Sequence, residues 1–185
     1  MNPDYIIKIV IGGAGGVGKT TLLHRYLHGE FLPDTSLTIG IQFHTKELMR
    51  NGQKIVLSLW DLGGQDRFRF LQPTYCKGAQ AGIVFFDMSF PGTIRQVKEW
   101  VDLFRNNTIG NIPIVLGGTK LDCVDKDVIE SIYLEARETV EDLGMLCFIP
   151  TSSKTGMNVQ ELISNIIDSV LALSARPKMQ APATN

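Results

Sequence analysis

The sequence has little of what marks secreted or nucleic-acid-binding proteins. Only three of its 185 residues are cysteines, with no C-x-x-C spacing, so neither a disulfide framework nor a cysteine zinc site is expected. Its charges almost cancel, with 18 Lys and Arg against 19 Asp and Glu, whereas a protein that binds nucleic-acid phosphates usually has a basic face. We therefore expect a cytoplasmic protein with no nucleic acid among its partners.

Long apolar runs are also missing. The longest one near the N-terminus, residues 5–11, is interrupted by Lys8 and is far shorter than the roughly 20 residues of a membrane helix. No signal peptide is recognisable, the start Met1-Asn2 lacks the glycine that myristoylation requires, and the last residues contain no cysteine to prenylate. The sequence thus predicts no lipid anchor of its own, so that only partners would recruit the protein to a membrane.

The overall composition is typical of one compact domain. Hydrophobic residues make up 44% of the chain and charged residues 20%, which is close to globular averages. No internal repeat is present, and only the end of the chain lacks a periodic pattern. We expect one domain over residues 1–175, a flexible tail over residues 176–185, and a monomer.

Apolar patterns predict six strands, over residues 4–12, 40–49, 55–60, 82–87, 112–118 and 147–150. The second and third form a hairpin through Asn51-Gly52. Apolar residues at three-and-four spacing predict helices over residues 21–28, 93–105, 126–143 and 159–173. One hairpin followed by alternating strands and helices predicts an α/β fold, with a six-stranded, mostly parallel sheet, one antiparallel edge strand and helices on both faces. A ligand would bind at the carboxyl ends of the strands.

A glycine-rich loop follows the first strand. Residues 13–20, Gly-Ala-Gly-Gly-Val-Gly-Lys-Thr, match G-x-x-x-x-G-K-[ST] at every fixed position. Glycines let successive backbone N–H groups surround a phosphate at a helix N-terminus. The Lys19 ammonium would bind the terminal phosphates and the Thr20 hydroxyl would bind Mg²⁺. An ordinary turn does not need four glycines and a Lys-Thr pair together, so the loop predicts a P-loop NTPase.

A second motif predicts which base is bound. Residues 118–122, Gly-Thr-Lys-Leu-Asp, follow the fifth strand at its carboxyl end. The Asp122 carboxylate could accept hydrogen bonds from the N1–H and the exocyclic amino group of guanine. Adenine offers neither donor, and a carboxylate left unpaired would cost several kcal/mol. The sequence therefore favours guanine over adenine.

With these motifs in order, residues 4–173 resemble the Ras superfamily of small GTPases. Thr38-Ile-Gly40 is similar to the first switch, Trp60-Asp-Leu-Gly-Gly-Gln65 to the second, and Thr151-Ser-Ser-Lys154 to the T-S-A-K loop. Thr-Ile-Gly-x-x-Phe at 38–43 is similar to Rab proteins. The Asp-Leu-Gly-Gly-Gln segment and the base motif are similar to fungal septation and mitotic-exit GTPases, and both branches remain open.

The resemblance implies a role for each matching residue. The catalytic residues would be Gln65, which orients the attacking water, and Lys19 and Thr38, which stabilise the transferred phosphate. Thr20, Thr38 and Asp61 would hold Mg²⁺. The implied nucleotide-binding residues are Gly13, Gly15, Gly16, Val17, Gly18, Lys19, Thr20, Thr21, Phe31, Thr38, Gly64, Thr119, Lys120, Asp122, Ser152, Ser153 and Lys154.

The same resemblance implies a molecular switch. GTP and GDP would be the ligands, with Mg²⁺ as cofactor, and loss of the γ-phosphate would release the loop of Thr38. An exchange factor, a GTPase-activating protein and effectors would bind the switch regions. Hydrolysis would be slow without an activator, because no arginine finger is evident and Gly15 leaves room for one from a partner. One alternative is a scaffold that binds GTP without hydrolysing it. A second is a P-loop kinase, which is less favoured because no arginine-rich lid segment is apparent in the sequence.

Several positions depart from the superfamily pattern. Thr119 replaces the asparagine of N-K-x-D, which predicts a weaker brace between the phosphate and base loops and a lower nucleotide affinity. Leu62 and Gly63 replace Thr-Ala in the second switch, and this change puts the choice of partners in doubt. The aromatic residues Phe43, Trp60 and Tyr75 resemble the triad that Rab proteins present to effectors, although ordinary packing explains them equally well. Cys123 and Cys147 are expected to be buried thiols.

Overall fold

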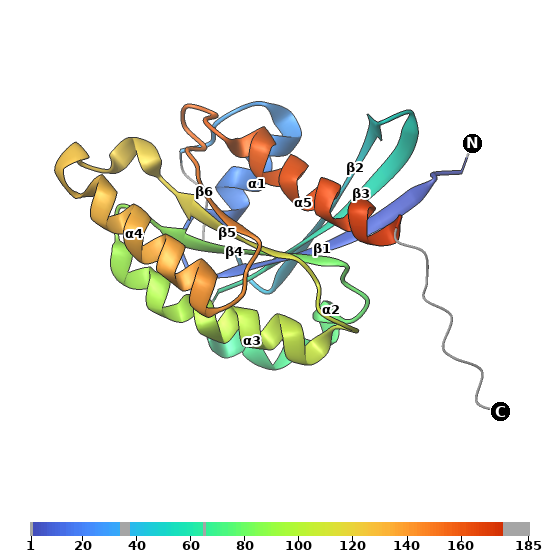
Figure 1. Cartoon of the computed structure of the whole chain (residues 1–185), viewed down its shortest axis with the longest axis horizontal. Coiled ribbons are helices and arrows are strands. Elements are labelled where there is room, and N and C mark those ends of the chain that lie inside the picture. The colour runs from blue at the N-terminus through green and yellow to red at the C-terminus, as the bar shows by residue number, and fades with distance from the viewer. Residues whose placement is uncertain (1, 34–37, 65, 176–185) are drawn as a thin grey trace.

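One six-stranded sheet runs through the computed structural model, which describes residues 2–33, 38–64 and 66–175 (Figure 1). The strand order is β2-β3-β1-β4-β5-β6, and every neighbouring pair is parallel except the β2–β3 hairpin. The strands are β1 (Tyr5–Gly13), β2 (Ile41–Arg50), β3 (Gln53–Leu62), β4 (Ala81–Asp87), β5 (Ile114–Thr119) and β6 (Cys147–Pro150). The predicted α/β architecture, with one antiparallel edge strand, is confirmed.

Helices cover both faces of the sheet. Buried residues of α1 (Lys19–His28) and α5 (Val159–Ser174) share one apolar cluster, and those of α2 (Gln72–Cys76), α3 (Val97–Asn107) and α4 (Lys126–Asp142) share the other. Short 3-10 segments add η1 (Asp66–Leu71), η2 (Pro91–Gln96) and η3 (Leu121–Cys123). The sheet is therefore the middle of three layers.

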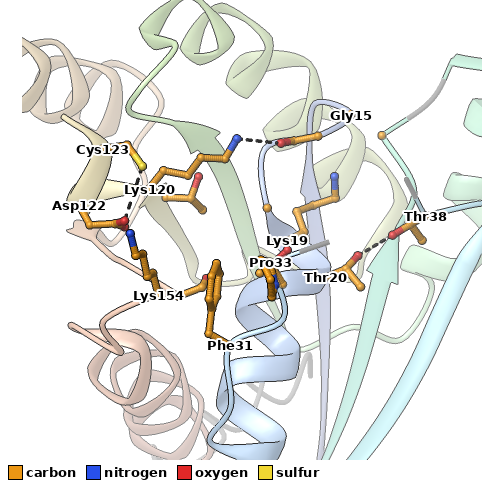
Figure 2. Close-up of a pocket in the computed structure, with 16 residues that line it drawn as sticks. Gly15, Lys19, Thr20, Phe31, Pro33, Thr38, Lys120, Asp122, Cys123 and Lys154 are labelled. Atoms are coloured by element: carbon orange, nitrogen blue, oxygen red, sulfur yellow. Dashed lines mark hydrogen bonds between the residues drawn. The ribbon is translucent and has the colours of Figure 1, made fainter. Parts of the chain in front are cut away.

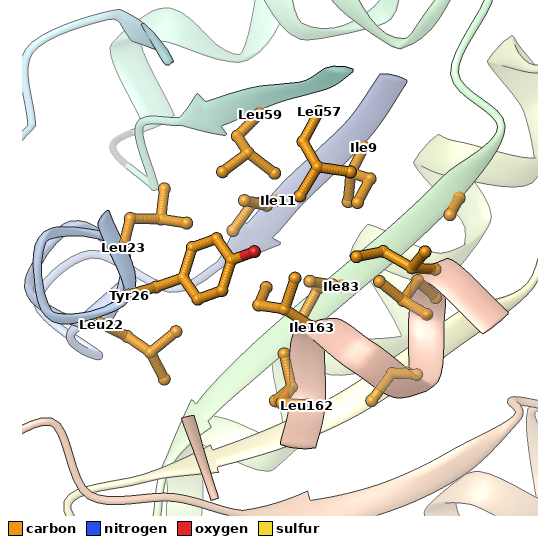
Figure 3. Packing of buried hydrophobic residues seen from close by; sticks show 14 of the residues in the cluster. Ile9, Ile11, Leu22, Leu23, Tyr26, Leu57, Leu59, Ile83, Leu162 and Ile163 are labelled. Carbon is orange, nitrogen blue, oxygen red and sulfur yellow. The ribbon is translucent and has the colours of Figure 1, made fainter. Parts of the chain in front are cut away.

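The strand residues alternate between the two clusters, as the period of two requires. Ile7, Ile9 and Ile11 of β1 face α1 and α5 and are fully buried, as Figure 3 shows for Ile9 and Ile11, while Val10 belongs to the opposite cluster. Every residue of β4 is buried, which explains why its sequence is continuously apolar rather than alternating. Burial on both faces fixes the register of the central strands, and with it the position of the loops at their carboxyl ends.

The differences from the expected elements are local. The apolar pattern predicts no element over residues 66–76, where the structure has η1 and α2. The helix expected over residues 93–105 is divided into η2 and α3, because Pro91 and Gly92 favour a tight turn at its start. The expected tail, residues 176–185, lies outside the described residues. None of the helices in the described ranges is long and apolar enough to cross a membrane.

Candidate functional site: a phosphate- and base-binding cleft

A cleft of about 610 Å³ opens at the carboxyl ends of the central strands. Figure 2 shows Lys19 and Thr20 on α1, Thr38 from the first switch segment, and Lys120 and Asp122 after β5 around this space. The residues come from segments far apart in the sequence, and the parallel sheet brings them to one edge. The residues predicted to bind phosphate thus lie at one end of the cleft and those predicted to bind the base at the other.

The phosphate loop links β1 to α1. Gly13 has a φ of +137°, and a Cβ there would lie 2.3 Å from the backbone oxygen of Phe85, so only glycine fits against β4. Gly18 precedes the helix with a φ of +94°, which a residue with a side chain rarely adopts. The loop therefore presents its backbone to the cleft at the N-terminus of α1, where an anion is stabilised.

Lys19 is buried below the loop. Its Nζ donates hydrogen bonds to the backbone oxygens of Gly13 (2.8 Å) and Ala14 (2.9 Å). Burial lowers the pKa of Lys19 to about 8, and the nearby Asp61 carboxylate opposes this shift. A phosphate bound in the cleft would supply the negative charge that favours the ammonium form.

Three oxygen-bearing side chains converge beside Lys19. Thr20 Oγ1 donates to Asp61 Oδ2 (2.5 Å) and lies 2.5 Å from Thr38 Oγ1. Burial raises the pKa of Asp61, against the effect of the Lys19 charge. Within the described residues, the other oxygen of Asp61, Oδ1, is buried without a hydrogen-bond partner. Hydroxyl and carboxylate oxygens are the donors that Mg²⁺ prefers, and an unpaired carboxylate oxygen suits a water of its coordination shell, so this set fits the ion.

No group of three or more His, Cys, Asp or Glu side chains gathers around a metal position in the described parts of the chain. The two hydroxyls and one carboxylate of Thr20, Thr38 and Asp61 are fewer ligands than octahedral Mg²⁺ takes. Mg²⁺ usually keeps waters and takes substrate phosphates as ligands. The ion would consequently bind here together with a phosphate.

Asp122 lies at the other end of the cleft. The Ser152 hydroxyl, itself buried, donates to Asp122 Oδ1 at 2.5 Å, and the Ser152 oxygen accepts a bond from the Thr155 backbone N–H at 3.1 Å. Partial burial raises the pKa of Asp122, but hydrogen bonds from Ser152, its own backbone N–H and Cys123, with the charge of Lys154, outweigh it, so this pKa lies below its usual value. The carboxylate is held ionised and oriented, as an acceptor for two base N–H groups must be.

The departure at Thr119 retains a brace between the two loops. Its Oγ1 donates to the backbone oxygen of Val17 at 2.5 Å, with the backbone oxygen of Phe86 3.1 Å away as a second acceptor. Thr119 is buried, so this bond is shielded from water. The hydroxyl thus supplies the link to the phosphate loop that was expected to weaken; a lower nucleotide affinity remains a prediction.

The second switch begins directly against the phosphate loop. A Cβ on Gly64 would lie 2.5 Å from the backbone oxygen of Gly13, so glycine is required for this approach. The Gly63 N–H donates to the backbone oxygen of Gly40 at 2.8 Å, which joins the two switch segments. Gln65, the predicted catalytic residue, lies outside the described residues, and its role remains a prediction.

Most of the predicted nucleotide-binding residues line the cleft. Gly13, Val17 and Ser152 do not; they pack behind it and position the loops. Pro33 and Cys123 line it without having been predicted. Cys123 is exposed and Cys147 is partly buried, so the expectation of two buried thiols was wrong. The signal for Cys123 was its place directly after Asp122, at the mouth of the base-binding end.

The aromatic triad forms a row that runs from the β2–β3 hairpin to Tyr75 on α2. The ring centroids of Phe43 and Trp60 lie 5.0 Å apart, and those of Trp60 and Tyr75 lie 5.5 Å apart. Phe43 is 53% exposed. The three rings therefore pack against one another while Phe43 is also exposed to solvent. Binding of effectors to this row remains a prediction.

Comparison with known proteins agrees with this geometry. The Ras family model matches residues 8–172. The chain is 35% identical over 174 residues to Ras-related protein Rab-11A of Dictyostelium discoideum, covering 94% of this chain and 80% of that protein. It is 30% identical over 181 residues to Ras-related protein RABA2a of Arabidopsis thaliana, covering 98% and 82%, and 36% identical over 165 residues to Ras-related protein Rab-5A of D. discoideum, covering 89% and 81%. The chain therefore belongs to the Ras family of small GTPases and is Rab-like.

Proposed function

We propose that the chain is a guanine-nucleotide switch, which binds GTP and GDP with Mg²⁺ and slowly hydrolyses GTP to GDP and phosphate. One observation supports this most directly. A single cleft joins the Lys19 ammonium and the phosphate loop at one end to the oriented, ionised Asp122 at the other. A nucleoside phosphate with donors on its base is the ligand that matches both ends.

At the phosphate end, backbone N–H groups of the loop and the Lys19 ammonium would bind the β- and γ-phosphates. Thr20, Thr38 and Asp61 would hold Mg²⁺, whose positive charge would neutralise the negative charge that develops on the phosphate oxygens. Gln65 would orient the attacking water, and the Gly64 N–H would bind the γ-phosphate. Thr38 would leave this position when the γ-phosphate is lost, which makes its segment the switch.

At the base end, the Asp122 carboxylate would accept hydrogen bonds from the guanine N1–H and amino group. Phe31 would pack across the base, the stem of Lys120 would lie along it, and the Ser153 backbone N–H would bind the guanine oxygen. Phe31 and Lys120 would contact either purine, whereas the hydrogen bonds of Asp122, held by the Ser152 hydroxyl, and of Ser153 would select guanine, because adenine would leave these polar groups unpaired.

Regulation would come from partners. No arginine lines the cleft in the described part of the chain, and Gly15 leaves space beside it. A GTPase-activating protein would supply the arginine and accelerate hydrolysis by up to about 10⁵-fold, as in the Ras example. An exchange factor and effectors would bind the switch segments, and such partners would recruit the protein, as a regulator of signalling or trafficking, from the cytoplasm to a membrane.

The first test identifies the nucleotide released from the purified protein and then follows single-turnover GTP hydrolysis for the wild type and Gln65→Leu. We expect GDP in the purified protein and slow hydrolysis that the variant loses. Bound GTP that the wild type never hydrolyses would instead indicate a scaffold.

Asp122→Asn should shift preference from guanine to xanthine nucleotides, and an unchanged preference would show that Asp122 does not recognise the base.

A further inference from the structure

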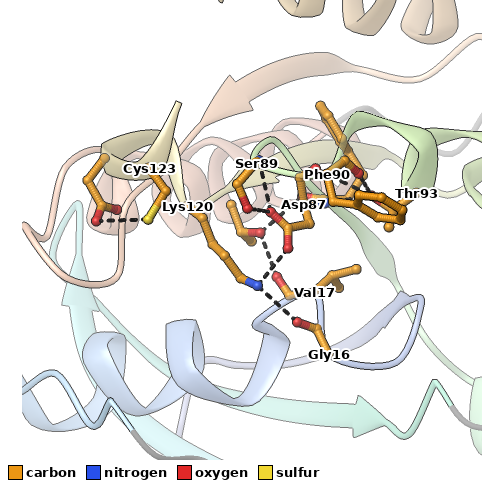
Figure 4. A network of polar contacts seen from close by, with 11 residues as sticks. Gly16, Val17, Asp87, Ser89, Phe90, Thr93, Lys120 and Cys123 are labelled. Atoms are coloured by element: carbon orange, nitrogen blue, oxygen red, sulfur yellow. Dashed lines mark hydrogen bonds and ion pairs between the residues drawn. The ribbon is translucent and has the colours of Figure 1, made fainter. Parts of the chain in front are cut away.

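A buried carboxylate beside the cleft has no part in the proposed contacts. Asp87 ends β4 and is 6% exposed. Its Oδ1 accepts hydrogen bonds from the Ser89 backbone N–H (2.9 Å) and the Ser89 hydroxyl (2.6 Å), while its Oδ2 forms an ion pair with Lys120 Nζ at 2.6 Å (Figure 4). Both oxygens are thus engaged, one by its own turn and the other by the base motif.

The partner of this carboxylate bridges to the phosphate loop. Lys120 has a φ of +58°, which turns the chain sharply after β5. Its Nζ also donates to the backbone oxygen of Gly16 at 3.3 Å, so one ammonium contacts both Asp87 and the phosphate loop. The side chain is 40% exposed, and it lines the nucleotide cleft.

The turn after β4 is itself fixed. The Thr93 hydroxyl accepts a bond from the Asp87 backbone N–H and donates one to the backbone oxygen of Phe90, both at 2.9 Å. The Met88 N–H donates to the backbone oxygen of Thr119 at 3.0 Å, which ties this turn to the base motif. The Asp87 carboxylate therefore has a rigid support on both sides.

An ion pair with an exposed partner contributes little to folding stability. The bonds from Ser89 restrict the orientation of the Asp87 carboxylate instead. A fixed acceptor beside a flexible lysine lowers the conformational freedom that the lysine must lose when the ligand binds. The arrangement is suited to holding Lys120 ready for a ligand.

We propose that Asp87 is a positioning residue for nucleotide binding, which holds the Lys120 ammonium against the phosphate loop so that the lysine stem lies along the base. The inference rests on the proposed function. With Thr119, which bonds Val17, the Asp87–Lys120 pair forms the second of two braces between the base motif and the phosphate loop.

The test measures release of a fluorescent GDP analogue, in excess Mg²⁺ and unlabelled GDP, from the full chain and from Asp87→Asn. Asparagine retains an oxygen for Ser89 but loses the charge that holds Lys120. We expect release to be about tenfold faster, the size of one lost charge-assisted hydrogen bond. Asp168→Asn is the matched control, since it removes an acid from the ion pair with Arg50, whose residues do not line the nucleotide cleft, and it should leave the release rate unchanged.

A double-mutant cycle separates positioning from a structural role. In a Lys120→Met background, Asp87→Asn should change the release rate by less than about twofold, because no ammonium remains to be positioned. An undiminished tenfold effect in that background would overturn the proposal.

Ser89→Ala provides a second variant if Asp87→Asn does not fold. It removes one bond to Oδ1 and should accelerate release by about threefold. A wild type that binds GDP, with Ser89→Ala and Asp87→Asn releasing it at the wild-type rate, would refute the role of Asp87. A wild type that binds no guanine nucleotide would instead refute the proposed function.

Discussion

Lys19 is a buried charged residue of the cleft. Without a phosphate its ammonium is desolvated, and its pKa falls to about 8 from 10.5. Because the folded-state pKa lies below the unfolded-state value, the unfolded chain binds more protons between these values, and stability rises with pH through this range. The penalty is fully present below pH 8, where the ammonium is charged and buried. Bound phosphate would remove that penalty.

The first prediction follows from this pKa. Nucleotide binding should raise the pKa of Lys19. At pH 8 the Lys19 amine of the nucleotide-free protein is about half protonated, so Lys19 should take up about half a proton from the buffer when GDP binds. Affinity should accordingly fall as the pH rises above 8. Calorimetric titrations in two buffers with different heats of ionisation measure the uptake. Equal enthalpies in both buffers at pH 8 would contradict the prediction.

Gly63 shows why one residue of the second switch departs from the superfamily pattern. A Cβ here would lie 2.5 Å from the backbone oxygen of Gly40 and 3.0 Å from that of Thr38. These are backbone atoms, so neither can rotate away. The absence of a side chain lets the Gly63 N–H reach Gly40, while the Gln72 amide donates to the Gly63 backbone oxygen at 3.0 Å.

The second prediction is therefore that Gly63→Ala lowers the free energy of unfolding by about 1–3 kcal/mol, the usual effect of overpacking. Urea denaturation with GDP and Mg²⁺ present would measure it. Gly92→Ala is the control, because no atom lies within 4 Å of the Cβ that it would gain. Equal stability of the two variants would show that the switch segments separate without cost.

At the scale of elements, the edge strand β2 is held by side chains as well as by its ladder with β3. Arg50, at its end, forms a two-pronged ion pair with Asp168 of α5, including a bond of 2.9 Å from Nε to Oδ1. Lys46 donates to the backbone oxygen of Tyr26 at 2.8 Å, near the end of α1, and lies 4.0 Å above the Tyr26 ring. These contacts anchor the hairpin to both helices of one face.

The third prediction concerns the Arg50–Asp168 pair. Asp168→Asn should reduce the free energy of unfolding by up to about 1 kcal/mol, because the pair is two-pronged but partly exposed. Added salt should shrink the difference. Asp102→Asn, which breaks the exposed pair with Lys98 on α3, should cost less. Chemical denaturation at low and high salt would compare the two, and a larger loss for Asp102→Asn would contradict this reasoning.

At the scale of the whole molecule, the cleft is assembled from both halves of the sheet. Its walls come from segments after β1, α1, β3 and β5 and from the loop between β6 and α5. A ligand that spans the cleft would link these segments and bind only the folded chain. Binding of this kind adds stability in proportion to the logarithm of ligand concentration.

The fourth prediction is that GDP with Mg²⁺ raises the unfolding temperature. At about 100 times the dissociation constant, the added stability should be about 2.7 kcal/mol, or roughly 5–10 °C for a chain of this size. Chelation of Mg²⁺ by EDTA should remove part of this gain, because Thr20 and Asp61 would lose their cation. Thermal melts with GDP, GDP plus EDTA, and ADP would test it; an equal shift with ADP would contradict guanine selection.

The architecture and the two ends of the site can be predicted from the amino-acid sequence alone. Period-two and continuous apolar runs predict the strands, because burial of one or both faces imposes those patterns. The phosphate loop and the base motif are readable because contiguous backbone must adopt one shape around a ligand group. For the same reason the sequence alone predicts that Lys19, Thr20 and Asp122 bind a ligand.

Contacts between segments that are distant in the sequence could not be predicted in this way, because they depend on the three-dimensional arrangement of the strands. Asp87 meets Lys120, and Thr119 meets Val17, because parallel strands place their carboxyl ends together. The need for glycine at position 63 arises from the backbone of the other switch. Local sequence fixes backbone shape and burial pattern, whereas contacts across the sheet depend on strand order and register, which no single segment contains.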